Sequence, residues 1–215
     1  MKTIILDEYN YISNLNLSSD FLNKGEVIAF PTETVYGLGC DFFNESAVKK
    51  IFELKGRELH KPLTAHISDL KFVDQLAENI PDEFFLLAEK FLPGPLTIIL
   101  RKNKSVPDVV TEGTNTIGFR FPDNLIALDV IKHFGKPLAA TSANLSGQSP
   151  AIEIKDIINN FNNKIPLIID GGLTIHQIAS TVIDLSNNKF YILREGAISK
   201  SVIETVLKTE LLTIK

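Results

Sequence analysis

Residues 30–66 read FPTETVYGLGCDFFNESAVKKIFELKGRELHKPLTAH, and they combine a polar turn, a helix and the start of a strand. An apolar strand over 27–30 leads into the stretch, and proline, threonines and glycines then break it. Asn44 is a good N-cap for a helix whose apolar residues recur at helical spacing, and Gly56 is a stop signal. A second buried strand over 63–67 follows. The stretch therefore predicts a strand–helix–strand unit around which the fold is built.

Basic residues crowd around the end of this helix, in a chain whose formal net charge is −4. Cations beside glycines and hydroxyls suit a polyanionic ligand. Lys49 and Lys50 are better explained as part of a solvated helix face. Lys55, Arg57 and Lys61 leave the helix together and precede the buried strand, so we interpret them as an anion-binding group.

Composition limits the class of protein. A chain of 215 residues with 44% hydrophobic residues can bury the core of one large domain. Apolar runs are too short for a membrane span, and the N-terminus turns acidic too soon for a signal peptide, so we expect a cytoplasmic protein. The lone Cys40 rules out an internal disulfide. The acidic balance argues against tight non-specific nucleic-acid binding.

The rest of the chain alternates strands and helices. Strands are expected over 2–6, 96–100, 116–121, 136–141, 167–169, 180–185 and 190–193, and helices over 69–76, 81–92, 123–134, 153–161 and 199–207. A short helix is expected after Ser18 or Ser19, and a loop over 102–115. Because some strands are joined by turns and others by helices, we predict a mixed sheet. No linker or repeat divides the chain, so we expect one domain over 1–215.

Several standard catalytic patterns are missing. There is no phosphate-binding loop of the G-x-x-x-x-G-K type, and Phe42 stands where a dinucleotide fingerprint starting at Gly37 needs its third glycine. The four histidines have no metal-ligand spacing, and G-x-S-x-G is absent. An enzyme built on this chain would therefore work by positioning and charge neutralisation, without a protein-bound metal cage.

Four residues are still candidates for a site. Arg120 lies inside an apolar strand, where a charge needs a ligand carboxylate or a carboxylate of the protein. Ser142 and Asn144 lie where a short strand ends, and small polar groups at this place commonly face a ligand crevice. Turn formation is the alternative here, and it remains plausible for Ser146 and Ser149. His66, among apolar neighbours, is on this ground alone more typical of a core histidine.

The sequence resembles the threonylcarbamoyl-AMP synthase family, the YrdC/TsaC-like proteins. The motif PTETVYGLG (31–39) is followed by KGR (55–57) and KPL (61–63). Further blocks occur in the family's order: FLPGPLTIIL (91–100), TIGFRFP (116–122), TSANLSG (141–147), STVID (180–184) and LREG (193–196). The similarity covers roughly residues 20–200. It implies a twisted, open α/β sheet of the YrdC type flanked by helices, with a ligand in its concave face. The chain resembles the short type, without an additional C-terminal domain.

The resemblance also implies a reaction. Threonine and bicarbonate (or CO2) form N-carboxythreonine, whose carbamate oxygen attacks the α-phosphorus of ATP, and pyrophosphate leaves. That oxygen is already anionic, so the protein must mainly align two anions and neutralise their charge. ATP would enter with Mg²⁺. The product, threonylcarbamoyl-AMP, would pass to a separate transferase complex that modifies tRNA to t6A37.

The implied site residues form two groups. ATP is expected to contact Lys55, Arg57, Lys61, Thr116, Ser142, Asn144, Pro150 and Arg194, of which Arg57, Lys61 and Arg194 would be catalytic. Threonine is expected to contact Thr32, Thr34, His66, Arg120, Ala140 and Ser180. A hairpin-end salt bridge remains an alternative role for Arg194.

Two other functions remain open at this point. One is a double-stranded RNA or tRNA-binding module of the same fold without turnover, and weak tRNA contact would also suit the synthase. The other is a carbamoyl-adenylate-forming enzyme like the related domain of hydrogenase maturation proteins, which normally sits in a much longer chain. Pyrophosphate release that requires threonine and bicarbonate would separate these hypotheses.

Overall fold

The computed structural model describes residues 2–56 and 61–213. Within them one sheet has the strand order β1-β8-β2-β3-β7-β4-β6-β5-β9-β10-β11. Its strands are β1 (Ile4–Leu6), β2 (Ile28–Phe30), β3 (Gly37–Asp41), β4 (Thr64–His66), β5 (Leu96–Arg101), β6 (Thr116–Arg120), β7 (Leu138–Ser142), β8 (Leu167–Ile169), β9 (Thr181–Asp184), β10 (Tyr191–Arg194) and β11 (Leu212–Thr213). The helices are η1 (Ile12–Asn14), α1 (Leu15–Asn23), α2 (Glu45–Lys55), α3 (Lys71–Leu76), α4 (Asp82–Phe91), α5 (Asp108–Thr111), α6 (Leu125–Phe134), α7 (Ile154–Phe161) and α8 (Lys200–Leu207).

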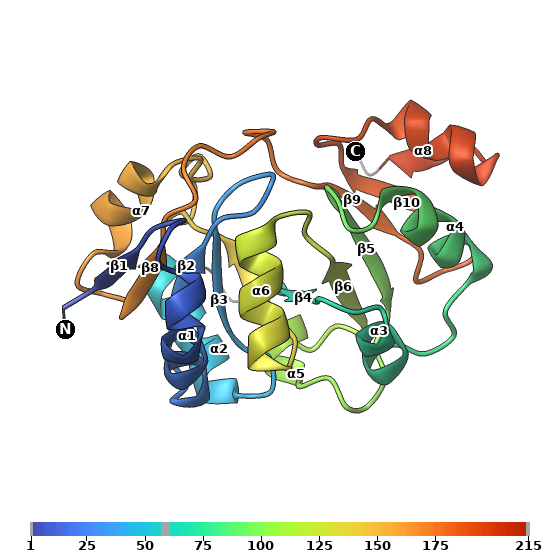
Figure 1. Cartoon of the computed structure of the whole chain (residues 1–215). Helices are drawn as coiled ribbons and strands as arrows, with labels where there is room; N and C mark the ends of the chain where they lie inside the picture. Colours follow the sequence, from blue (N-terminus) through green and yellow to red (C-terminus); the bar gives the residue numbers. More distant parts are fainter. Residues whose placement is uncertain (1, 57–60, 214–215) are drawn as a thin grey trace.

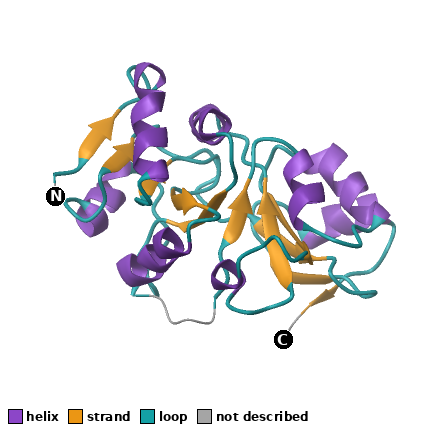
Figure 2. Cartoon of the chain, turned by 90° about the horizontal axis from the view of Figure 1, so that it is seen from below, coloured by secondary structure: helices purple, strands orange, loops and turns teal. Residues whose placement is uncertain are grey.

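The sheet is open and mixed, which confirms the predicted fold class. Neighbours such as β4 and β6 run parallel, whereas β2 and β3, β3 and β7, and β5 and β6 run antiparallel. Helices surround the sheet, and β1 and β11 lie at opposite ends of it (Figure 1; Figure 2). The strands predicted over 180–185 and 190–193 form as the antiparallel pair β9 and β10.

Two apolar clusters flank the sheet. The smaller one joins α1 and α6 to residues of β1, β2, β7 and β8, including Phe30 and Leu138. The larger one lies largely on the other face, with α2, α4, α7 and α8. Helices α1 and α6 pack against each other and cover this face of the sheet over β1, β2, β7 and β8. The same face carries a pocket farther along the sheet, over β4, β6, β5 and β9.

Strand β3 was not predicted, because its two glycines weaken any strand signal in the sequence. It lies between β2 and β7, and the ring of Phe30 on β2 occupies the space above it. A Cβ at Gly39 would lie 2.7 Å from that ring. Glycine is therefore needed here for packing in a buried strand.

The local signals around α2 are confirmed. The Asn44 side chain accepts a hydrogen bond from the backbone N–H of Ala47 at 3.1 Å, and Gly56 ends the helix with a left-handed backbone, φ 56°. Two other predictions were wrong. Helix α1 begins at Leu15 rather than after Ser18, and the expected loop over 102–115 contains α5.

None of the helices in the described ranges is long and apolar enough to cross a membrane.

Candidate active site

Strand pairing builds the floor of the site from two cross-strand rows. One row runs Ala140, Thr64, Gly118, Ile99, Asp184, and the next runs His66, Arg120, Thr97, Val182, Arg194. Residues that pair across strands point to the same face of a sheet, so each row presents its side chains together. The small residues of the first row leave room above the sheet, and the second row concentrates polar and charged groups.

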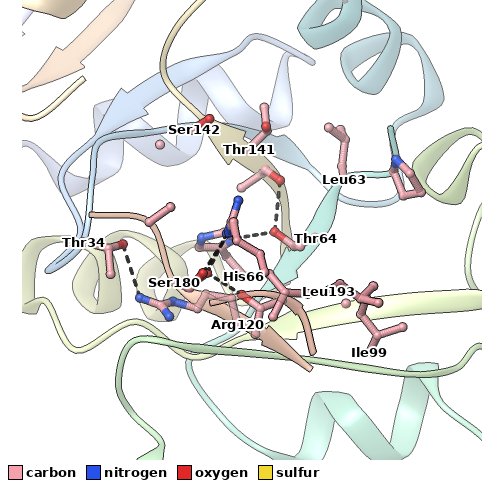
Figure 3. A pocket seen from close by; sticks show the side chains of 18 of the residues that line it. Thr34, Leu63, Thr64, His66, Ile99, Arg120, Thr141, Ser142, Ser180 and Leu193 are labelled. Carbon is pink, nitrogen blue, oxygen red and sulfur yellow. Dashed lines mark hydrogen bonds between the residues drawn. The ribbon is translucent and has the colours of Figure 1, made fainter. Parts of the chain in front are cut away.

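Above these rows lies a cavity of about 390 Å³ (Figure 3). This volume lies within the range typical of small-molecule sites. Nine of the residues assigned from the sequence line it: Thr32, Thr34, His66, Thr116, Arg120, Ala140, Ser142, Ser180 and Arg194. They come from segments far apart in the chain, so the fold brings together most of the predicted site.

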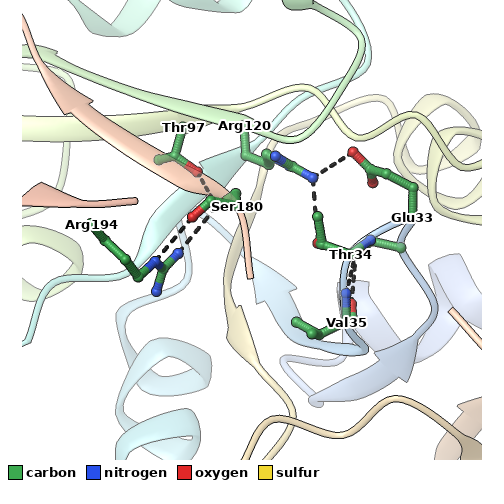
Figure 4. A network of polar contacts seen from close by, with 8 residues as sticks. Glu33, Thr34, Val35, Thr97, Arg120, Ser180 and Arg194 are labelled. Carbon is green, nitrogen blue, oxygen red and sulfur yellow. Dashed lines mark hydrogen bonds and ion pairs between the residues drawn. The ribbon is translucent and has the colours of Figure 1, made fainter. Parts of the chain in front are cut away.

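Arg120 is the most deeply buried cation of the pocket, and its partner is Glu33. The Nη2 group donates to Glu33 Oε1 at 2.5 Å, and each side chain is 2% exposed (Figure 4). Burial lowers the pKa of Arg120, and the Glu33 carboxylate opposes that shift. Nη1 of the same guanidinium is buried with no hydrogen-bond partner in the described part of the chain. The sequence analysis offered a protein carboxylate or a ligand carboxylate as the partner of Arg120. The structure is compatible with both, because Glu33 binds one nitrogen of the guanidinium and leaves the other available.

The turn before β3 holds Thr34 beside that arginine. Thr32 Oγ1 donates to the carbonyl of Val35 at 2.6 Å, so it must accept from Thr34 Oγ1, 2.9 Å away. Thr34 Oγ1 in turn accepts from Arg120 Nη2 at 3.4 Å. Thr32 thus shapes the turn, and Thr34 lies between it and the guanidinium.

Ser180 connects Arg120's neighbour Thr97 with Arg194. The two hydroxyls of Thr97 and Ser180 are 2.8 Å apart, and Arg194 donates to the Ser180 backbone carbonyl and hydroxyl at 3.0 and 3.2 Å (Figure 4). Partial burial lowers the pKa of Arg194. The contacts fix the arginine at the pocket wall through its Nε and Nη2 groups. The hairpin-end salt bridge considered for Arg194 is not formed with any described carboxylate.

His66 lines the pocket between Phe30 and Thr64. The Phe30 ring meets it edge-on with centroids 6.1 Å apart, and its Nδ1 lies 3.3 Å from Thr64 Oγ1. Burial, and after it the Arg120 charge, lower the pKa of His66 from 6.5 to about 3, although a hydrogen bond to the Thr64 backbone opposes both effects. The imidazole is therefore neutral at neutral pH.

Four predicted residues lie elsewhere. Lys55 is buried, and its ammonium donates to the carbonyls of Ser142 and Asn144, so it holds the loop after β7 in place. Asn144 uses its amide within that loop, accepting from Ser142 Oγ at 2.6 Å and donating to Leu145 and Gln148. Lys61 and Pro150 are exposed and do not line the pocket. Arg57 lies outside the described residues.

Sequence reasoning missed Glu33, Thr64 and Thr97. Glu33 lies in the polar turn that opens the chain's most unusual stretch, and the two threonines interrupt apolar strands. Thr64 is two positions from His66, and Thr97 pairs with Arg120, so each points to the same face of the sheet as that residue. Knowledge of the strand register would therefore have identified both threonines as pocket residues.

No group of three or more histidine, cysteine, aspartate or glutamate side chains within 2–56 and 61–213 could hold a metal ion. Asp184 is the single carboxylate among the described lining residues, beside two arginines. The donor set therefore suits an anionic ligand, and a cation would need most of its ligands from that ligand and water.

An open mixed α/β sheet with a cationic pocket on one face defines a class of small-molecule-binding proteins. The chain belongs to the Sua5/YciO/YrdC family, whose model, described as telomere recombination, matches residues 20–196. This finding confirms the resemblance seen in the sequence.

Similar proteins carry a consistent name. The threonylcarbamoyl-AMP synthase of Pyrococcus abyssi is 42% identical over 207 residues, which cover 95% of this chain and 61% of that protein. The Bacillus subtilis protein of the same name is 41% identical over 187 residues, which cover 86% and 54%. The crystal structure of P. abyssi Sua5 complexed with L-threonine superposes with a TM-score of 0.95 at 40% identity, covering all of this chain and 63% of that one. The chain thus spans between about half and three fifths of these relatives.

Proposed function

We propose that this chain is a nucleotidyltransferase that makes threonylcarbamoyl-AMP and pyrophosphate from L-threonine, bicarbonate or CO2, and ATP. The observation that carries the proposal is the row His66, Arg120, Thr97, Val182, Arg194, which places two arginines at one pocket wall. Its support is the similarity to synthases and to a structure that holds L-threonine.

Arg120 is the proposed partner of the threonine carboxylate. Its Nη1 is a buried donor without a partner among the described residues, and a carboxylate oxygen is the acceptor that forms the strongest hydrogen bond with it. Thr34, His66, Ala140 and Ser180 line the same pocket and are the remaining proposed threonine contacts.

Arg194 is the proposed phosphate contact, with Ser142 and Thr116 along the same cavity. The Ser180 contacts orient the guanidinium and leave Nη1 available for phosphate oxygens. Lys61 precedes the lining residue Pro62, so its flexible ammonium can approach a triphosphate at the pocket edge, and Arg57 is proposed to do the same.

These groups suffice for an in-line displacement. The carbamate oxygen of N-carboxythreonine forms a bond to the α-phosphorus while the bond to the β-phosphate bridging oxygen breaks, and pyrophosphate takes that electron pair. No proton must be removed from the attacking oxygen. Positioning and charge neutralisation by the arginines supply the catalysis. Mg²⁺ would be held mainly by the phosphates, with Asp184 as the one described pocket carboxylate available to it.

Pyrophosphate release in the presence and absence of each substrate tests this proposal. We expect release to require both threonine and bicarbonate, and Arg120→Ala to abolish it. ATP turnover that ignores the amino acid would refute the synthase, whereas RNA binding without any ATP turnover would favour the RNA-binding module. The product is expected to serve a separate tRNA threonylcarbamoyl transferase complex, which can be tested by adding such a complex and tRNA.

A further inference from the structure

Thr64 shares the pocket with His66 but has no assigned role. The two residues are separated by one position on β4, so their side chains project from the same face of the sheet. Thr64 Oγ1 lies 3.1 Å from the carbonyl oxygen of Ala140 on β7 and 3.3 Å from His66 Nδ1 (Figure 3).

The direction of these hydrogen bonds follows from the groups involved. A carbonyl oxygen can only accept, so Thr64 must donate its single hydroxyl proton to Ala140. Toward His66 the same hydroxyl can then only accept. The proton of the neutral imidazole therefore sits on Nδ1, and the lone pair sits on Nε2.

The lone pair faces a site that already contains a cation. His66 and Arg120 are direct partners across β4 and β6, and the guanidinium charge disfavours protonation of the ring. Among residues 2–56 and 61–213, the side-chain hydrogen bond of the His66 ring is the one between Nδ1 and Thr64 Oγ1, and His66 lines the pocket. The donor that binds this lone pair must also lie close to the Arg120 guanidinium. The guanidinium would repel an ammonium donor, but it would not repel a neutral hydroxyl donor.

We propose that Thr64 is a positioning residue that holds His66 as the Nδ1–H tautomer, so that Nε2 accepts a hydrogen bond from the side-chain hydroxyl of the bound amino acid. The identity of this amino acid as threonine rests on the proposed function, but the tautomer does not. With its carboxylate on Arg120, the amino acid would present its β-hydroxyl within reach of the neighbouring ring.

The tautomer is tested without any ligand. Nitrogen-15 NMR of the histidine rings near neutral pH, in protein labelled at histidine, distinguishes a protonated Nδ1 from a protonated Nε2. We expect Nδ1–H for His66 in the parent and in Thr64→Ser, which keeps the hydroxyl, and a weaker preference in Thr64→Val, which keeps only the backbone contact of residue 64. A protonated Nε2 in the parent would overturn the proposal.

Recognition is tested by affinity. Thr64→Val should weaken L-threonine binding by about three- to ten-fold, the scale of one hydrogen bond, and leave L-valine competition and ATP affinity unchanged. Thr64→Ser should restore threonine affinity. In a His66→Ala background, Thr64→Val should have no further effect, because the residue acts through the ring.

The outcomes separate the two proposals. If the parent does not bind threonine at all, the proposed function fails while the tautomer result still stands. If Thr64→Val weakens threonine and valine equally, or lowers ATP affinity as well, the residue only supports the pocket and the proposed hydroxyl contact is wrong.

Discussion

Single residues of this site have partners that are remote in the chain. Glu33 and Arg120 are 87 positions apart, and both are 2% exposed. The sequence could predict that Arg120 needs a counter-charge, because a lone buried charge is costly. It could not identify Glu33, because that pairing depends on how the polar turn folds over β6. Within the described part of the chain, Glu33 Oε2 and Arg120 Nη1 have no hydrogen-bond partner, so the hydrogen-bonding capacity of the pair is only partly used.

Removing one member of this pair should be severe. Glu33→Ala leaves the buried guanidinium without its counter-charge, so we expect a loss of about 3–5 kcal/mol in the free energy of unfolding, measured with urea. Glu26→Ala is the comparison variant, because its ion pair with Lys50 is far more accessible to solvent, with the two side chains 32% and 42% exposed, and should contribute about 0–1 kcal/mol. Equal effects of the two substitutions would show that the buried pair has no special role in stability.

His66 predicts a pH dependence whose sign can be worked out. Its pKa falls from 6.5 to about 3 on folding, so between these values the unfolded chain binds more protons. The free energy of unfolding therefore carries no penalty from His66 above pH 6.5, where the ring is neutral in both states. It decreases as the pH falls from 6.5 toward 3, because protonation of the ring then favours the unfolded chain. The stability advantage of the parent over His66→Gln should shrink with decreasing pH. A stability difference between the parent and His66→Gln that does not change with pH would contradict the prediction.

At the scale of elements, local signals predicted local structure. Asn44 and Gly56 fixed the ends of α2, since both act through their own backbone neighbourhood. Strand β3 and helix α5 were missed, because their formation depends on distant partners. Phe30 lies over β3, and the carbonyl of Val110 in α5 accepts from the backbone N–H of Leu63. The helical spacing of α2 did predict correctly which of its faces is buried.

Phe52 on that face tests the packing of α2. It is 5% exposed within the larger apolar cluster, so Phe52→Ala should remove buried contacts and leave a cavity. We expect a loss of about 3–5 kcal/mol, measured by urea unfolding. Phe85→Ala on α4 is the matched control, because that ring is 52% exposed and should contribute far less. A small effect at both positions would mean that the helix does not depend on this contact.

At the scale of the molecule, the site exists because of strand register. The pocket is lined by residues of seven strands, from β3 to β10, and the two cross-strand rows run over the middle of the sheet. The family motifs identified most of the residues, but neither the rows nor the role of Lys55 as a loop anchor follows from sequence spacing. The larger apolar cluster contains residues from β8 at one end of the sheet to β10 near the other, so the halves of the sheet have no separate cores.

The whole chain should therefore unfold as one unit, and a ligand in the pocket should stabilise all of it. Calorimetry is expected to show a single transition whose calorimetric and van't Hoff enthalpies agree. A ligand at a hundred times its dissociation constant adds about 2.7 kcal/mol when it binds the folded state only. L-threonine should thus move the entire transition to higher temperature, and L-threoninol, which lacks the carboxylate proposed to bind Arg120, should move it much less. Two transitions, of which threonine shifts only one, would show that the strands on either side of the pocket fold independently.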